Sequence, residues 1–297
     1  MYHIQPRKGN VSLVYLLKAL LPNGGYVAIF SGQSENLEAY FDESMTNEAL
    51  PLTSVSGYLF EPQEYLAFEE GMKALLHKKE LSYFRMSECL HLTEQFAKYA
   101  KNSDEPRIIE TEVIRLTRKH ALMGVGGVVS EAMYNLIRPA GHEDLCGAYA
   151  FLCQWCLAEI GKWCDRNSFN GDIAYFFEAG CTDQIEANRI MNNVSLVPDL
   201  MRQYRFHSHS FVRKGKLRGI EAADMLTWFI RRQGEDEENK RRGRPSRVER
   251  RKDFQALIGR TELELRGIEH RYKFFDEASL QGHFSEPINA DPAQRWY

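Results

Sequence analysis

The sequence predicts an α/β fold in which a mixed β-sheet is flanked by helices. Two strand-like segments come early, at residues 37–44 and 52–60, and are close enough to pair as neighbours. Helical and strand-like segments then alternate along the chain, a pattern typical of sheets that contain parallel strands covered by helices. No repeat of fixed period is present, so a solenoid or propeller is not expected.

The individual elements follow from hydrophobic periodicity and from turn signals. Apolar, β-branched and aromatic runs predict strands over residues 25–30, 37–44, 52–60, 81–86, 121–129, 172–177, 204–212 and 271–275. Apolar residues at helical spacing predict helices over residues 11–21, 61–76, 91–99, 105–119, 145–165, 182–193 and 220–232. Pro62 in a first turn and Thr182 as an N-cap support two of the helix starts.

The composition is that of a globular protein with a sizeable core. The chain has 297 residues, 43 % of them hydrophobic and 12 % aromatic. Its formal net charge is −3, so only a local patch could attract nucleic acid or a membrane surface. No run approaches the roughly 20 apolar residues of a membrane span. Residues 11–21 are apolar but lack a cleavage site, so a signal peptide is not expected either.

Cysteine usage points to the same class of protein. Of six cysteines, four lie in one predicted helix, at Cys146, Cys153, Cys156 and Cys164. The C-x-x-C pair is not followed by a second Cys or His pair at zinc-finger distance. We therefore expect these thiols to pack in the core as small hydrophobic side chains. Unpaired thiols without a secretion signal predict a cytoplasmic location.

Carboxylates at the ends of predicted elements form the candidate site. Asp42 lies near the end of an early strand, and Glu88 and Glu178 close two later strands. Asp224 lies on a late helix, with Glu221 one turn earlier on the same face. Strand ends gather at one edge of an α/β sheet, where ligands usually bind, and a helix packed across the sheet could bring Asp224 there.

Such a group of carboxylates predicts a site for divalent cations. Unpaired carboxylates are costly to bury and raise one another's pKa when clustered. Hard oxygen ligands suit Mg²⁺ or Mn²⁺, and two such cations support in-line phosphodiester chemistry. We expect four of these carboxylates to be catalytic and all five to be metal ligands, whereas Glu43 should face the opposite side of its strand and either be structural or support a ligand from behind. The four expected catalytic residues are Asp42, Glu88, Glu178 and Asp224, and Glu221 joins them as an expected metal ligand.

These motifs resemble those of the bacterial family catalogued as domain of unknown function 3800, which is ribonuclease H-like. That family has an Asp-Glu near its N-terminus, as in Asp42-Glu43-Ser44, and a Gln-x-x-Asp near its C-terminus. Here Glu221 stands in place of the Gln, within Ile220-Glu221-Ala222-Ala223-Asp224-Met225-Leu226. Phe84-Arg85-Met86-Ser87-Glu88 is similar to the middle segment of the family, with Arg85 in place of a His. The resemblance covers about residues 37–232 and implies a ribonuclease H-like fold and metal-dependent nuclease activity.

The chain then divides into four parts: an N-terminal extension over 1–36, the ribonuclease H-like domain over 37–232, a charged linker over 233–252 and a C-terminal tail over 253–297. Within the linker, Lys240–Lys252 carries eight Lys and Arg against one Glu, a net charge of 8 − 1 = +7. Its Arg-Gly-Arg-Pro run matches the core of an AT-hook, which can enter a narrow A·T minor groove. A solvated charged loop is the alternative, but this basic C-terminal extension is the expected contact for nucleic acid.

Two other motifs receive structural interpretations. His207-Ser208-His209 places two imidazoles on one strand face without an adjacent third ligand, so an ordinary strand is expected. Gly124-x-Gly126-Gly127 lies inside an apolar run without a Lys, and it predicts a bend in the sheet instead of a nucleotide-binding loop.

Three functions remain open at this point. The first is a divalent-metal-dependent nuclease or related phosphoryl-transfer enzyme. The second is a non-catalytic module on the same fold that binds nucleic acid or protein. The third is a metal-dependent phosphohydrolase for a small substrate, which a closed pocket would favour over an open groove. Convergence of the four catalytic carboxylates within about 8 Å of one centre would favour an enzyme, because paired metals lie roughly 4 Å apart.

Overall fold

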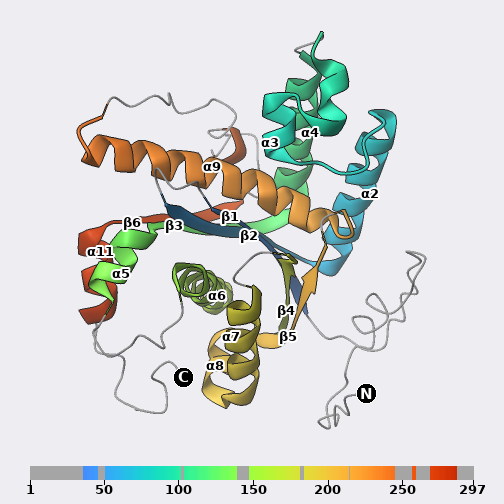
Figure 1. Ribbon diagram of the computed structural model, residues 1–297. Coiled ribbons are helices and arrows are strands. Elements are labelled where there is room, and N and C mark those ends of the chain that lie inside the picture. The colour runs from blue at the N-terminus through green and yellow to red at the C-terminus, as the bar shows by residue number, and fades with distance from the viewer. Residues whose placement is uncertain are drawn as a thin grey trace.

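The computed structural model describes residues 36–45, 51–101, 104–138, 147–180, 184–213, 215–244, 256–258 and 268–285. These residues form three layers, in which helices cover both faces of a six-stranded mixed sheet (Figure 1). The predicted α/β fold with a mixed, helix-flanked sheet is therefore confirmed. The helix predicted over 11–21 and the strand predicted over 25–30 lie outside the described residues.

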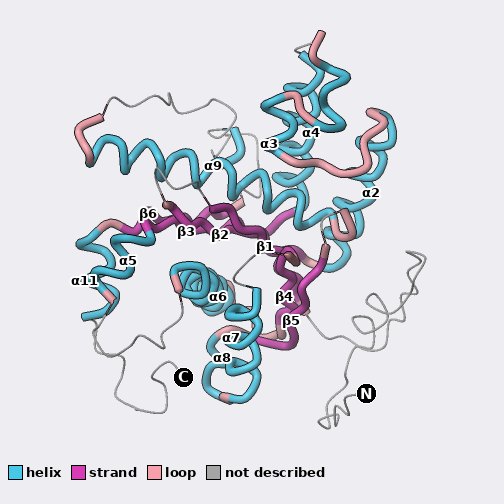
Figure 2. Tube along the Cα trace, in the orientation of Figure 1, coloured by secondary structure: helices cyan, strands magenta, loops and turns pink. Residues whose placement is uncertain are grey.

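The sheet has the strand order β5-β4-β1-β2-β3-β6 (Figure 2). Strands β1, β2 and β3 form an antiparallel meander, β4 runs parallel to β1, and β5 runs parallel to β4. β6 pairs with β3 in parallel, so this segment of the predicted C-terminal tail belongs to the sheet. The strand bounds are β1 Leu37–Met45, β2 Leu52–Phe60, β3 Ala121–Ser130, β4 Ile173–Glu178, β5 Phe206–Val212 and β6 Glu269–Phe275.

The helices divide between the two faces of the sheet. One face is covered by α2 (Pro62–Lys78), α3 (Met86–His91), the 3₁₀ helix η1 (Glu94–Tyr99), α4 (Asp104–His120) and α9 (Arg218–Arg241). The other face is covered by α5 (Glu131–Ile137), α6 (Ala148–Arg166), α7 (Gln184–Leu196), α8 (Pro198–Gln203) and α11 (Glu277–Ser285). α9, drawn in orange in Figure 1, crosses the sheet along most of its width.

Strand β1 contributes to both cores because its side chains alternate between the faces of the sheet. Leu37, Ala39 and Phe41 belong to the core under α6. Tyr40 points the other way, into the core under α9, where its ring stacks on two other aromatic rings. Asp42, two positions further along, therefore faces the α9 layer, and it is buried there.

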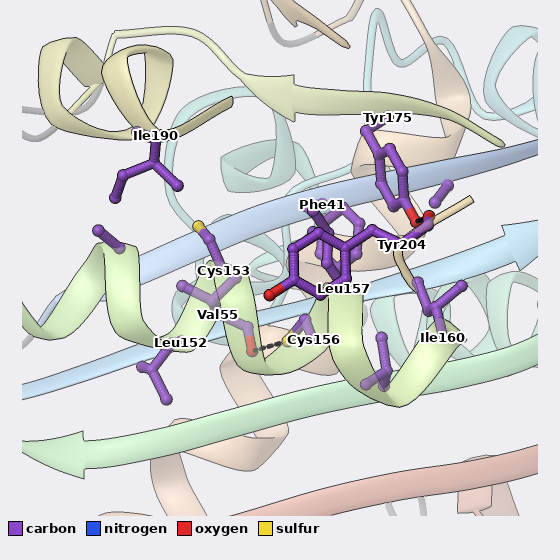
Figure 3. Packing of buried hydrophobic residues seen from close by; sticks show 14 of the residues in the cluster. Phe41, Val55, Leu152, Cys153, Cys156, Leu157, Ile160, Tyr175, Ile190 and Tyr204 are labelled. Carbon is purple, nitrogen blue, oxygen red and sulfur yellow. Dashed lines mark hydrogen bonds between the residues drawn. The ribbon is translucent and has the colours of Figure 1, made fainter. Parts of the chain in front are cut away.

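The cysteines of α6 pack in the core, as predicted. Cys153, Cys156 and Cys164 are buried and unoxidised, and Cys146 lies outside the described residues. In Figure 3 the Cys156 thiol points at the backbone of β2, where Sγ lies 3.8 Å from the Val55 carbonyl oxygen. These side chains act as small apolar groups that let α6 lie close against the sheet.

The glycines of β3 have a different role from the predicted bend. β3 runs unbroken from Ala121 to Ser130. A Cβ at Gly126 would lie 2.5 Å from Ile230 Cδ1 of α9, and a Cβ at Gly127 would lie 2.8 Å from Leu152 Cδ2 of α6. The glycines thus allow one helix on each face to approach the strand closely.

Three predicted elements differ from the structure. The helix predicted over 91–99 is the last residue of α3 followed by the 3₁₀ helix η1, because Leu92 adopts a left-handed conformation that ends α3. The segment 81–86 is not a strand but a loop that leads into α3. α9 does not end at residue 232 but continues to Arg241, so the first half of the predicted charged linker is helical. Ion pairs at helical spacing stabilise this extension, including Arg231 with Glu235.

Candidate functional site

A cavity of about 250 Å³ lies where the carboxyl ends of β1 and β4 meet α9 and the start of α3. Its lining combines four carboxylates with two guanidinium groups and one indole. The lining residues are Asp42, Glu43, Ser44, Arg85, Ser87, Glu178, Ala179, Gly180, Asp224, Trp228 and Arg231. Three of the five predicted metal ligands are therefore brought together, and two are not.

Asp42 and Glu178 are neighbours because of the strand register. β1 and β4 are parallel, and Phe41 pairs with Phe177, so the next residue of each strand lies at the same edge and on the same face. Asp42 is buried and Glu178 is partly exposed. Glu43 is also among the residues that line the cavity, although the alternation of β1 places its side chain on the opposite face of the strand from Asp42.

Asp224 reaches the cavity from α9, which packs directly on β1. The Thr227 hydroxyl, one turn further along, donates to the Asp42 carbonyl oxygen at 3.2 Å. Asp224 is almost fully buried, and its Oδ2 accepts a hydrogen bond of 2.7 Å from the Met86 backbone N–H. Its other oxygen, Oδ1, lies 4.0 Å from Nε of Arg85. The carboxylate is thus fixed on one side and faces a cation on the other.

Glu221 does not line the cavity and instead braces the loop that leads into α3. It is fully buried, its Oε2 accepts a hydrogen bond of 3.1 Å from the Phe84 N–H, and its Oε1 pairs with Arg218. Burial raises the pKa of Glu221 to about 7, although the Arg218 guanidinium and the Phe84 N–H act in the opposite direction. Glu221 and Asp224 thus accept the N–H groups of Phe84 and Met86, two positions apart, and together fix the loop at the start of α3.

Glu88 is also absent from the lining of the cavity. It lies within α3, where its Oε1 accepts a hydrogen bond of 2.9 Å from the Tyr83 hydroxyl. Because the segment before it is not a strand, Glu88 does not stand at a strand end as predicted. Arg85 and Ser87 of the same segment face the cavity in its place.

Among the lining residues that were not predicted as site residues, three have large aromatic or cationic side chains. Trp228 and Arg231 follow Asp224 by four and seven positions, so they lie on the same face of α9. This helical spacing from Asp224 could have predicted that Trp228 and Arg231 line the same site. Arg231 is ion-paired with Glu235, and burial lowers the pKa of its guanidinium. The third residue is Arg85, and only its position in the segment that resembles the middle segment of the family pointed to the site.

Over the ranges that the structure describes, no group of three or more His, Cys, Asp or Glu side chains is arranged to hold a metal ion. Asp42, Glu178 and Asp224, the three expected ligands that line the cavity, do not form a closed ligand shell among the described residues. The two histidines of β5 do not act together either. His209 Nε2 lies 2.9 Å from the Asn188 side-chain oxygen, and His207 Nδ1 lies 3.9 Å from Asp172.

The start of the predicted basic contact is engaged within the chain. Glu238 is buried and pairs with Arg241 and Arg242 at 2.8 and 2.7 Å. These ion pairs stabilise the last turn of α9. Residues 245–252 lie outside the described part of the chain. No described helix is long and apolar enough to cross a membrane.

No protein-family model matches the chain, and no curated protein is significantly similar to it in sequence.

Proposed function

We propose that the cavity is the active centre of a divalent-metal-dependent nuclease, or related phosphoryl-transfer enzyme, with a ribonuclease H-like fold. The observation that carries the proposal is that Asp42, Glu178 and Asp224, from three distant segments, line one cavity. A meander of β1–β3 followed by two strands parallel to β1 agrees with the fold that the motif resemblance implies. The mixed charge of the cavity also suits a reaction at phosphate.

The donor set fits a hard divalent cation in chemistry. All three groups are carboxylates, which Mg²⁺ and Mn²⁺ prefer. One oxygen of Asp224 accepts the Met86 N–H, so Oδ1, which faces Arg85, would be the oxygen that joins Asp42 and Glu178 as a ligand. A bound cation would supply charge stabilisation at a phosphoryl oxygen and a water of lowered pKa. The chain itself would orient Asp224 through the loop that Glu221 braces.

Metal binding is tested by thermal unfolding of the whole chain. A cation at 100 times its Kd should stabilise the wild type by about 2.7 kcal/mol, a Tm rise of about 5–10 °C for a domain of this size. Asp42→Asn combined with Asp224→Asn should lose the rise, because two anionic ligands become neutral. Asp199→Asn, an exposed carboxylate on α8, is the matched control and should keep it. The same Tm with Mn²⁺ and with EDTA in wild type would refute the metal site.

Catalysis is tested separately with labelled DNA and RNA in Mn²⁺ or EDTA. Asp224→Ala should abolish cleavage and leave binding largely intact, because phosphate contacts and catalysis depend on different residues. Cleavage retained by the purified variant would place the activity elsewhere. The expected role of Glu88 and Glu221 is structural support, so Glu88→Gln should retain most of the activity.

A second candidate function is a non-catalytic module that binds nucleic acid. The observation in its favour is that Arg85 lies beside Asp224, so a cation of the chain already stands where a metal would have to approach. This candidate predicts binding that is equal in Mn²⁺ and EDTA, with no cleavage in either.

The basic segment is the proposed source of further phosphate contacts. Arg241 and Arg242 are committed to Glu238, so Arg244 and the basic residues after it should provide these contacts. Neutralising Arg244 and Arg247 should lower the slope of log affinity against log salt by about one unit per lost contact. Neutralising Arg241 and Arg242 should instead lower the Tm. An equal change of slope in both pairs of variants would contradict this assignment.

A further inference from the structure

We propose that Arg85 and Arg231 bind the phosphate group of the substrate inside the cavity, and that Arg85 leaves Asp224 to do so. The inference rests on the proposed function and extends it to the substrate class, a phosphate ester that is recognised before any metal acts. Both guanidinium groups line the cavity, one from the start of α3 and one from α9.

Arg85 is available for exchange. Its side chain is 50 % exposed, and its Nε lies 4.0 Å from Asp224 Oδ1, which is too long for a direct hydrogen bond. An ion pair of this exposure contributes little stability, so its replacement by a stronger charge-assisted bond is favourable. A phosphate oxygen is such an acceptor, and Arg presents two parallel donors to it.

Arg231 has N–H donors that its ion pair with Glu235 does not use. A guanidinium carries five N–H donors, and Arg231 uses Nη1 to pair with Glu235. Its Nε is buried and has no hydrogen-bond partner among the residues that the structure describes. A buried donor without an acceptor is costly, so a shift of the Arg231 side chain that brings this N–H to a ligand oxygen in the cavity would be favourable.

The carboxylates of the cavity explain why the guanidinium groups of Arg85 and Arg231 are needed to bind a phosphate. Four carboxylates line the cavity, and without opposing charge they would repel a phosphate. The cavity volume of about 250 Å³ lies just below the usual range of roughly 300–1,000 Å³ for sites that enclose a drug-sized ligand. It suits a phosphate with its attached sugar, and the remainder of a longer substrate would lie outside.

The test measures phosphate binding in EDTA, so that it does not depend on metal or on cleavage. The probes are inorganic phosphate and a dinucleoside monophosphate, which carries only an internal phosphodiester. Isothermal titration of the whole chain should detect binding of at least one probe. A preference for inorganic phosphate would indicate a terminal phosphate as the natural group, and a preference for the dinucleoside an internal one.

The variants assign the binding to the two arginines. Arg85→Ala should raise the Kd by about 10-fold, the loss expected for one charge-assisted contact. Arg231→Ala should raise it similarly, and Arg231→Lys serves if the alanine variant folds poorly. Arg232→Ala is the matched control, because Arg232 pairs with the same Glu235 but does not line the cavity, and its Kd should change less than about twofold.

Asp224→Asn should tighten phosphate binding in EDTA, because it removes both a competitor for Arg85 and a repelling charge. An unchanged Kd in Arg85→Ala, or no binding of either probe by the wild type, would overturn the inference. Arginine-dependent phosphate binding without cleavage in Mn²⁺ would uphold it and refute the nuclease proposal, so the two failures are distinguishable.

Discussion

The buried carboxylate of Glu221 should make the stability of the protein depend on pH with a defined sign. Burial raises its pKa from an ordinary value of 4.5 to about 7, against the opposing contacts of Arg218 and the Phe84 N–H. The folded protein therefore binds a proton between about pH 4.5 and pH 7 that the unfolded chain has released. The free energy of unfolding must then fall as the pH rises through this window, and it stays level above it.

The magnitude follows from the size of the pKa change. Each pKa unit corresponds to about 1.4 kcal/mol, so a rise from 4.5 to about 7 amounts to about 3 kcal/mol. Glu221→Gln removes the titration but keeps an oxygen that can accept from the Phe84 N–H. Relative to this variant, the wild type should lose about 3 kcal/mol of stability between about pH 4.5 and pH 8.

The measurement is urea unfolding of wild type and variant across this pH range, in EDTA. His270 titrates with the opposite sign, because burial lowers its pKa to about 4 and its contribution to stability is lost as the pH falls below about 6.5. It is present in both proteins and cancels in their difference. A difference that grows in favour of the wild type as the pH rises would refute the reasoning, and it would mean that the Arg218 pair outweighs burial.

Two further predictions concern packing and hydrogen bonding under α9, and urea unfolding checks both. Gly219→Ala should lower the free energy of unfolding by about 1–3 kcal/mol, because its Cβ would lie 2.4 Å from Cγ of the Tyr40 ring. Gly282→Ala, with no atom within 4 Å of the new Cβ, is the control and should be neutral or stabilising by up to about 1 kcal/mol. Thr227→Val should cost about 1–3 kcal/mol, because it removes the partner of the buried Ser56 hydroxyl. An unchanged unfolding midpoint in Gly219→Ala or Thr227→Val would contradict the corresponding packing or hydrogen-bond argument.

The sequence was sufficient to predict where strands end, and this placed two of the cavity carboxylates. Asp42 and Glu178 were assigned to strand ends, and the parallel register of β1 and β4 sets them side by side. Asp224 was predictable because the apolar periodicity of residues 220–232 indicates an amphipathic helix, and such a helix packed across the sheet carries Asp224 to the strand ends. These predictions depend on local pattern together with one rule of topology.

The prediction of a strand over residues 81–86 was wrong because side chains of α9 bind the backbone of this segment where a neighbouring strand was expected. The apolar and aromatic residues of 81–86 predict a strand, but the Phe84 and Met86 N–H groups are accepted by the side chains of Glu221 and Asp224 and not by a neighbouring strand. No local pattern reveals that acceptors 137 and 138 positions away will be side chains. For the same reason Glu88 lies within α3 and not at a strand end, and Glu221 binds the Phe84 N–H and does not line the cavity.

The extension of α9 was within reach of the sequence. The acidic run before the basic segment was interpreted as a linker, yet Arg231 and Glu235, and Glu238 and Arg242, are spaced by four positions. Such pairs predict a continuing helix.

The walls of the cavity are made at very different times while the chain is synthesised. The contact between the Thr227 hydroxyl and the Asp42 carbonyl spans 185 positions. At ~5–20 residues per second, a ribosome needs roughly 10–40 s to pass from one to the other. During that interval the β1–β2 pair can form, but the α9 wall, with Asp224 and Arg231, does not yet exist. If the cavity cleaves nucleic acid, the nascent chain is harmless to the messenger that encodes it, and a product that stops before α9 carries no active centre.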